Sequence, residues 1–440
     1  MTVTTFPAAV FARRRARLMR RLPRNSAAVF GAGREAQRNG DVDYPFRQRS
    51  SFYYLTGLKE PDAVAVLRPG HEQPFVLLVR PYDPETAIWD GPRLGVEGAV
   101  AELGADAAYP IGELEERLPK LLGEARTVAF SLGSDERLER LISRIVAGRR
   151  AGAQRGAPAI ERLIDPAPLV DALRLIKTRE EIAALQQAID ITGAGIEAAM
   201  RATRPGLHEY EVQAVLEAEF RRLGSPRDGF PSIVAAGVNS CTLHYTENRA
   251  PIANGDLLLL DVGAEVDYYG ADVSRTYPAN GRFRAAQRDV YEIVLAAQRE
   301  AIALVAPGVR FHDVHERAQR VITEGLRDLG VIEGRMPALL KQEASRPYFM
   351  HGTSHWLGMD VHDAGLYRED GESVVLRPGM VLTVEPGLYF APGLRGVPRR
   401  LRGIGVRIED DVLVTRTGCR VLSGAIPKDP DTLEAIVGSG

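Results

Sequence analysis

Two aspartates in the C-terminal half of the sequence have the types and spacing of a metal site. Asp261 and Asp272 are eleven residues apart in DVGAEVDYYGADVSRTYP, and Gly263 and Gly270 between them indicate turns, so a hairpin can bring them together. Two like charges at close range are costly unless a cation lies between them, and Arg275 is the one cation in this stretch. The pair predicts a bound metal ion, with surface turn or capping aspartates as the alternative.

A second pair of carboxylates lies within apolar sequence. Glu385 is part of VLTVEPGLYF and Glu409 is part of IGVRIEDDVLV, so both are expected in buried strands. Burying unpaired carboxylates costs several kcal/mol each, and Arg407 alone is too little positive charge for all four. The two glutamates therefore favour a metal site over a set of surface acids.

Three of the eight histidines lie close together in FMHGTSHWLGMDVHD, as His351, His355 and His362. They offer a nitrogen ligand. His351 and His355 have the spacing of a helical zinc pair, but the Gly-Thr that follows His351 indicates a loop. His312 and His315 instead fall on an amphipathic helix, where we expect solvated or capping side chains.

A repeat at an offset of 124 residues is expected to position these carboxylates. Gly255 precedes Asp261 by six residues in GDLLLLDVG, and Gly379 precedes Glu385 by six residues in GMVLTVEPG. The helix starts RPGLHEYEV and APGVRFHDV form a similar pair. Each copy gives a turn glycine, a hydrophobic strand and a carboxylate at the strand end, so duplicated halves would direct their carboxylates to one centre. The alternative is chance similarity around Pro-Gly pairs.

The length of 440 residues predicts two domains. Short apolar runs alternate with helical stretches in the first part, which predicts an α/β domain over residues 1–175. A stretch rich in Gly, Ala, Arg and Pro at 147–168 leads to a long helix over 177–200. We therefore expect the catalytic domain over residues 176–440.

The composition excludes several classes of partner. A formal charge of −2 leaves no field that attracts nucleic acid, and the arginine cluster at 13–24 is expected to form a solvated amphipathic helix. No apolar run is long enough to cross a membrane, and no export signal follows the arginines. Cys241 and Cys419 are typical of reduced, inert thiols, so we expect a cytoplasmic protein.

The motifs together resemble the Xaa-Pro aminopeptidases, or aminopeptidases P, of the pita-bread metallopeptidase family. The similar blocks in the C-terminal half are HYTEN, DVGAEVDYYGADVSRTYP, HGTSHWLGMDVHD, VEPGLY and RGIGVRIEDD. The similarity extends to YPFRQRSSFYYLTGLKEPDAV and to Trp89 with GPRLG, and so covers nearly the full length. It implies an α/β N-terminal domain followed by an α+β pita-bread catalytic domain with pseudo-twofold duplicated halves.

The resemblance implies a dinuclear site with five metal ligands: Asp261, Asp272, His355, Glu385 and Glu409. Asp272 and Glu409 would bridge the two ions. Asp261 would bind one ion, and His355 and Glu385 would bind the other. Four carboxylates and one imidazole, with no thiolate, favour Mn²⁺ as the divalent ion. Two ions about 3.5 to 4 Å apart can deprotonate a bridging water at neutral pH and polarise the scissile carbonyl.

The resemblance also assigns catalytic roles to five side chains: His244, His351, His362, Glu385 and Arg407. Glu385 would move a proton towards the leaving proline nitrogen, and His362 would donate a hydrogen bond to the developing oxyanion. Arg407 would orient the carboxylates, and His244 and His351 would line the substrate pocket.

The implied activity is a hydrolase reaction that releases the N-terminal residue from peptides with proline at the second position. A homotetramer or homodimer is expected, with Trp89 of one subunit near the active site of a neighbour. A prolidase, which cleaves only Xaa-Pro dipeptides, shares all five ligands and is the main alternative. Metal-free creatinase-like enzymes and pita-bread binding modules are disfavoured, because they should show broken ligands.

Overall fold

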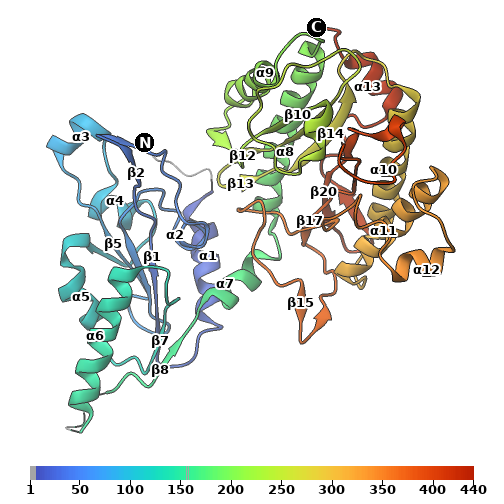
Figure 1. Cartoon of the computed structure of the whole chain (residues 1–440). Coiled ribbons are helices and arrows are strands. Elements are labelled where there is room, and N and C mark those ends of the chain that lie inside the picture. The colour runs from blue at the N-terminus through green and yellow to red at the C-terminus, as the bar shows by residue number, and fades with distance from the viewer. Residues whose placement is uncertain (1–5, 155, 157) are drawn as a thin grey trace. The chain divides into compact units, whose positions relative to one another are not determined.

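A computed structural model describes residues 6–154, 156 and 158–440 of the chain. The chain forms two compact units, Met1–Leu173 and Arg174–Gly440, which are described separately below (Figure 1).

The N-terminal unit is built on a mixed sheet of six strands in the order β6-β5-β4-β1-β7-β8. Its strands are β1 (Ser26–Gly31), β4 (Val64–Leu67), β5 (Phe75–Val79), β6 (Ala107–Pro110), β7 (Thr127–Ala129) and β8 (Arg162–Ile164). The strand β1 pairs antiparallel with β4 and parallel with β7. A small separate hairpin consists of β2 (Gln37–Asn39) and β3 (Val42–Asp43).

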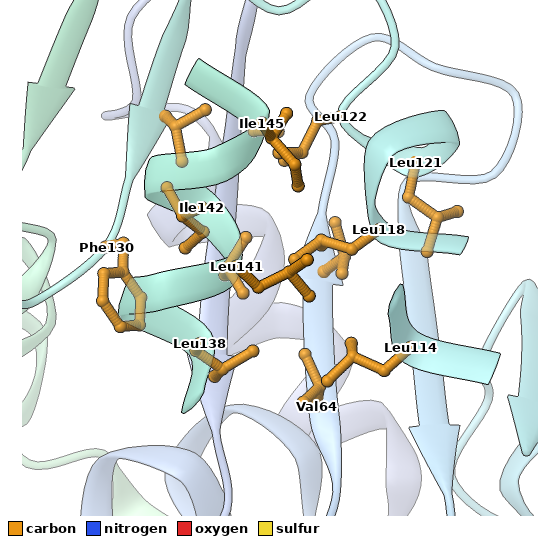
Figure 2. Close-up of a cluster of buried hydrophobic side chains, with 14 of the residues drawn as sticks. Val64, Leu114, Leu118, Leu121, Leu122, Phe130, Leu138, Leu141, Ile142 and Ile145 are labelled. Carbon is orange, nitrogen blue, oxygen red and sulfur yellow. The ribbon is translucent and has the colours of Figure 1, made fainter. Parts of the chain in front are cut away.

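Helices cover both faces of this sheet, with α5 and α6 on one side and α1 and α2 on the other (Figure 1). The helices of the unit are α1 (Ala8–Met19), α2 (Ser50–Thr56), α3 (Pro84–Asp90), α4 (Gly95–Ala101), η1 (Ile111–Glu113), α5 (Leu114–Leu121), α6 (Glu136–Ala153) and α7 (Ala167–Arg174). Figure 2 shows leucine and isoleucine side chains of α5 and α6 directed towards one another and towards Val64 of the sheet. Because α6 extends to Ala153, it includes the first part of the Gly-, Ala-, Arg- and Pro-rich stretch at 147–168.

The helix α1 does not match the expectation of a fully solvated arginine cluster. Arg14 and Arg15 are buried, at 2% and 4% exposure. The Arg14 guanidinium lies 4.2 Å from the Tyr54 ring centroid, and that of Arg15 lies 3.7 Å from the Phe75 ring centroid. Arg15 also donates to the carbonyl oxygen of Leu55 at 2.9 Å. The expectation was wrong for these two side chains because aromatic faces and carbonyl groups replace water around their charges.

The first half of the C-terminal unit consists of two helices and two small antiparallel sheets, β10-β11-β14 and β13-β12-β9. Its elements are α8 (Arg179–Ala202), α9 (Glu209–Arg222), β9 (Arg227–Asp228), β10 (Ile233–Ala236), η2 (Gly237–Cys241), β11 (Leu257–Val262), β12 (Ala264–Val266), β13 (Tyr269–Gly270) and β14 (Val273–Pro278). The long helix predicted over 177–200 is α8, and Thr178 begins it with a capping box to Glu181.

The second half again places a helix pair before an antiparallel sheet, here β17-β20-β21, and the strands lie between the two helix pairs (Figure 1). Its helices are α10 (Ala285–Leu304), α11 (Phe311–Asp328), α12 (Met336–Lys341), η3 (Arg399–Leu401) and α13 (Pro430–Ile436). Its strands are β15 (Arg368–Glu369), β16 (Glu372–Ser373), β17 (Val381–Val384), β18 (Gly387–Tyr389), β19 (Gly405–Arg407), β20 (Asp410–Val414) and β21 (Cys419–Val421).

The turn glycines of the proposed repeat occupy equivalent positions in the two halves. Gly255 precedes β11 with φ of 86°, and Gly379 precedes β17 with φ of 92°, a left-handed conformation that favours glycine. Asp261 lies near the end of β11 as expected. Glu385, however, follows β17 instead of lying inside a strand, and Glu409 lies between β19 and β20. Both glutamates are thus in short connections, and the backbone N–H of each is held by a carbonyl of another segment.

Of the helices in the described ranges, none combines the length and the apolar composition that a membrane crossing requires.

Candidate metal centre

One pocket of the C-terminal unit contains every side chain singled out as a ligand or catalytic group. It is lined by Leu243, His244, Asp261, Asp272, His351, Gly352, Ser354, His355, His362, Tyr367, Glu385, Arg407 and Glu409. These residues come from both halves of the unit, so the pocket lies where the two halves meet.

The antiparallel pairing of β11 with β14 brings the first two carboxylates together. Asp261 is opposite Ser274 in this pairing, and Asp272 directly precedes β14. Glu409 joins them from the other half, because its backbone N–H donates to the Ser274 carbonyl at 3.1 Å. The Ser274 hydroxyl also donates to Glu409 Oε2 at 2.7 Å. The side chain of Ser274 therefore holds a carboxylate of one half against a strand of the other.

His355 presents one ring nitrogen to these acids. Its Nδ1 lies 3.0 Å from the Trp356 carbonyl oxygen, which assigns the proton to Nδ1. Its Nε2 lies 3.2 Å from Asp272 Oδ2 and 3.5 Å from Glu385 Oε1. Ligand atoms of Asp272, His355 and Glu409 all lie within 4.8 Å of one another. This spacing and this tautomer suit a cation held between the carboxylates and Nε2.

The pocket has more negative charge than its own residues neutralise. Burial raises the pKa of Asp272 and of Glu409 well above the usual range, and the neighbouring carboxylates raise both pKa values further. Burial also raises the pKa of Glu385, to about 7. Among the described residues, Arg407 is the one arginine or lysine that lines the pocket, and Asp261 Oδ1 is buried without a hydrogen-bond partner. The donor set therefore fits bound divalent cations.

Arg407 is fixed by four partners at the base of the pocket, one of which is the Leu243 carbonyl at 3.5 Å. Its guanidinium donates to Asp261 Oδ2 at 2.6 Å, to the Ser274 hydroxyl at 2.9 Å and to the Tyr389 hydroxyl at 3.1 Å. Burial lowers the pKa of Arg407, but Tyr389, Asp261 and Glu409 outweigh burial, and the pKa lies well above its usual value. Arg407 is thus a permanent cation that orients the Asp261 carboxylate.

The three remaining histidines differ in exposure. His351 lies in the pocket wall, and its Nε2 is 2.8 Å from the Tyr389 hydroxyl. Burial is the main cause that lowers the pKa of His351 to about 4, and the positive charge of Arg407 is the second. His244 and His362 are exposed within the pocket. The His362 ring centroid is 4.3 Å from that of His355, and burial, followed by the His355 and His244 charges, lowers the pKa of His362. At neutral pH the His351 and His362 rings can therefore donate one hydrogen bond without carrying charge.

Comparison with known proteins assigns this pocket to a family. The model of metallopeptidase family M24 matches residues 183–416, which include the whole candidate site. The chain belongs to metallopeptidase family M24. A second model, that of the aminopeptidase P N-terminal domain, matches residues 11–129 of the M24 protein.

Relatives of this M24 protein match over nearly the whole chain. The Xaa-Pro aminopeptidase of Escherichia coli K12 is 41% identical over 97% of both chains. A structure of Pseudomonas aeruginosa aminopeptidase PepP has a TM-score of 0.96 and 44% identity, and the match covers 99% of this chain and 98% of that one. A structure of proline aminopeptidase P II from Yersinia pestis has a TM-score of 0.94 and 41% identity, and the match covers 98% of this chain and 99% of that one. The comparisons confirm the expected α/β N-terminal domain and pita-bread catalytic domain.

Some supporting residues of the M24 site were not found from the sequence. His315, expected to be solvated or capping, is half-buried, and its Nδ1 lies 2.9 Å from the Thr353 hydroxyl. The Thr353 carbonyl in turn accepts from the Glu385 backbone N–H at 2.8 Å. His312 is exposed, as expected. Helical spacing did not separate the two histidines, because His315 is held by a loop distant in sequence.

Proposed function

We propose that this chain is a metal-dependent aminopeptidase that releases the N-terminal residue from peptides with proline at the second position. The observation that carries the proposal is the pocket that four carboxylates and His355 line together, with Arg407 as the one arginine or lysine of its described lining. The full-length similarity to proteins named Xaa-Pro aminopeptidase supports the choice of substrate.

The proposed cofactor is a pair of divalent ions, for which we favour Mn²⁺. Asp272 and Glu409, the two carboxylates at the centre, would contact both ions, Asp261 would contact one, and His355 and Glu385 the other. Carboxylate oxygens and one imidazole, without thiolate, are the ligand set that suits Mn²⁺. When bound, such ions lower the pKa of a coordinated water and polarise a carbonyl group. Loss of Xaa-Pro-Xaa cleavage after chelation and its return with Mn²⁺ test the proposal; full activity after exhaustive metal removal would contradict it.

The side chains of the pocket would then divide the remaining tasks. Glu385 would carry a proton from the attacking water to the leaving proline nitrogen, since its carboxylate lies inside the cluster. His362, exposed in the pocket beside His355, would donate a hydrogen bond to the oxygen on which negative charge develops. His244 and His351 would contact the substrate, and Arg407 would keep the Asp261 carboxylate in place.

Replacing His362 by alanine is expected to lower kcat about a hundredfold, because removal of one oxyanion donor typically costs that much. Metal content, measured by elemental analysis, should be unchanged. A suitable control is His312→Ala, which removes an exposed imidazole on α11 and should leave kcat as it is. Loss of metal from the His362 variant would instead make that residue a ligand.

The proposal includes a homo-oligomer, a tetramer or a dimer, and a cytoplasmic location, with peptides as the partners and no nucleic acid or membrane. Trp89 and Ile88 of α3 are 87% and 81% exposed, an unusual exposure for large apolar side chains, and covering them in an assembly would remove that surface from water. We expect Trp89 to approach the active site of a neighbouring subunit. Light scattering on the purified protein should show an oligomer, and a fully active monomer would contradict this assembly.

A further inference from the structure

Glu209, the first residue of α9, is a buried carboxylate outside the metal pocket. It is fully buried, and none of the Lys, Arg or His side chains in the described ranges forms an ion pair with it. Four donors surround it instead. They are the Ala236 N–H at 2.7 Å, Asn239 Nδ2 at 3.0 Å, the Tyr245 hydroxyl at 2.8 Å and the Ala250 N–H at 2.8 Å. Four donors, together with the N-terminal end of the α9 dipole, compensate the buried charge.

The four donors lie on both sides of His244. Ala236 ends β10 and Asn239 belongs to η2, whereas Tyr245 directly follows His244 and Ala250 lies further along. The Glu209 backbone N–H also donates to the Ala250 carbonyl, at 3.1 Å. From residue 242 to residue 250 the chain has no helix or strand of its own. The shape of this loop therefore depends on side-chain anchors, and Glu209 connects its beginning with its end.

His244 depends on these anchors for its position. Its imidazole is exposed in the pocket, and no hydrogen bond or ion pair within the described chain fixes it. Other contacts also hold the loop: Arg407 Nη2 donates to the Leu243 carbonyl at 3.5 Å, the Gly405 N–H donates to the Ser240 hydroxyl at 3.0 Å, and Asn248 binds β10. The side chain that directly follows His244 is that of Tyr245, and its hydroxyl donates to the buried Glu209.

We propose that Glu209 is a positioning residue for His244, acting through Tyr245 and the loop backbone so that the imidazole meets the substrate. This inference rests on the proposed function, in which His244 contacts the peptide. It gives α9, which does not line the pocket, a part in substrate binding.

The substitution Glu209→Gln tests the role of the second carboxylate oxygen at nearly constant volume. One oxygen accepts from the Ala236 N–H and the other from the Ala250 N–H. Because a glutamine has one acceptor oxygen and one NH₂ group, each orientation of the amide leaves one of these backbone N–H groups facing a donor. The loop must therefore shift on at least one side of His244.

We expect Glu209→Gln to lower kcat/KM for an Xaa-Pro-Xaa peptide about tenfold, mainly through a higher KM, with metal content unchanged. The matched control is Glu211→Gln. Glu211 lies on the same first turn of α9 and is half-exposed, and its side chain accepts from the His208 N–H instead of from the loop. This control should stay within about twofold of the wild type. A loss of active molecules alone would lower apparent kcat and leave KM unchanged, which would overturn the proposal.

A double-mutant cycle separates positioning from general stabilisation. In a His244→Ala background, Glu209→Gln should change kcat/KM less than about twofold, because the residue that it positions is gone. An undiminished tenfold effect in that background would overturn the proposal. If Glu209→Gln does not fold, Tyr245→Phe removes one donor without changing the loop backbone; it should raise KM about threefold, and an unchanged KM would equally overturn the proposal.

A readout without substrate distinguishes this inference from the proposed function. With eight histidines in the chain, the His244 ring signal can be assigned in NMR spectra of histidine-labelled protein by its loss in His244→Ala. The signal should move in Glu209→Gln and in Tyr245→Phe, and stay in place in Glu211→Gln. Movement of the signal in a protein that cleaves no Xaa-Pro peptide would refute the proposed function alone, whereas an unmoved signal would refute the positioning role.

Discussion

Glu409→Gln is expected to lower peptide hydrolysis more than about a thousandfold and to reduce the bound metal. Removing a residue that only supports a metal ligand typically lowers metal affinity or activity about 10- to 100-fold. Glu409 lies at the centre of the carboxylate cluster, so its loss should cost more. The amide keeps the volume of the side chain and can still accept from Ser274, so the protein should fold. Elemental analysis and single-turnover rates measure the two effects.

The metal-free form of the same variant should be more stable than the metal-free wild type. Burial is the main cause of the raised pKa of Glu409, and the neighbouring buried carboxylates raise this pKa further. Replacing Glu409 by a neutral side chain therefore relieves repulsion within the cluster. Asp410→Asn is the contrast. Asp410 faces Arg275 at 2.9 Å, Gln298 at 2.6 Å and Lys428, so its loss should lower Tm while the folded protein still binds metal. Near wild-type turnover with full metal in Glu409→Gln would refute the role of Glu409 as a ligand.

Peptides with proline at the second position should be cleaved about a hundredfold faster, by kcat/KM, than the same peptides with alanine there. Proline has no N–H and a φ fixed near −65°, so a rigid apolar wall can select it by fit. His351, held by a 2.8 Å hydrogen bond to the hydroxyl of the buried Tyr389, lines the pocket together with His244, a proposed substrate contact. A matched series of Xaa-Pro-Xaa and Xaa-Ala-Xaa tripeptides measures the ratio.

The same series extended to Xaa-Pro dipeptides distinguishes an aminopeptidase from a prolidase. A prolidase needs a positive group to bind the dipeptide carboxylate. Within the part of the chain that the structure describes, Arg407 is the one arginine or lysine that lines the pocket. It already forms an ion pair with Asp261. Tripeptides should therefore be cut faster than dipeptides, and Trp89→Ala should slow mainly the longer peptides. A preference for dipeptides, with Trp89→Ala silent, would favour prolidase.

The acidic members of the site could be predicted because their chemistry is visible in sequence. A carboxylate in an apolar stretch must have a partner, and Glu385 and Glu409 lie in such stretches. Asp261 and Asp272 are recognised instead by their spacing around turn glycines. The turn glycines gave the architecture for a similar reason, since Gly255 and Gly379 adopt conformations that other residues rarely adopt.

The residues that hold these groups in place could not be predicted in the same way. Ser274 joins two halves of the unit, and His315 reaches Thr353 across 38 positions of sequence, so neither contact leaves a local pattern. The sequence around Arg14 and Arg15 is typical of solvated charges, and their burial depends on tertiary contacts with Tyr54 and Phe75. Glu209 has an ordinary helix-start sequence, and its burial depends on a loop that comes later in the chain.

The network around Asp410 also has a consequence for synthesis of the protein on the ribosome. Arg275 donates to the carbonyls of Ile426 and Pro427, and Lys428 binds Asp410, so the strand next to Glu409 is secured by residues translated after every proposed ligand. Domains generally fold as the nascent chain emerges, N-terminal first. The N-terminal unit can therefore fold while translation continues, whereas the strand beside Glu409 gains these anchors only after residues 426–428 have left the exit tunnel.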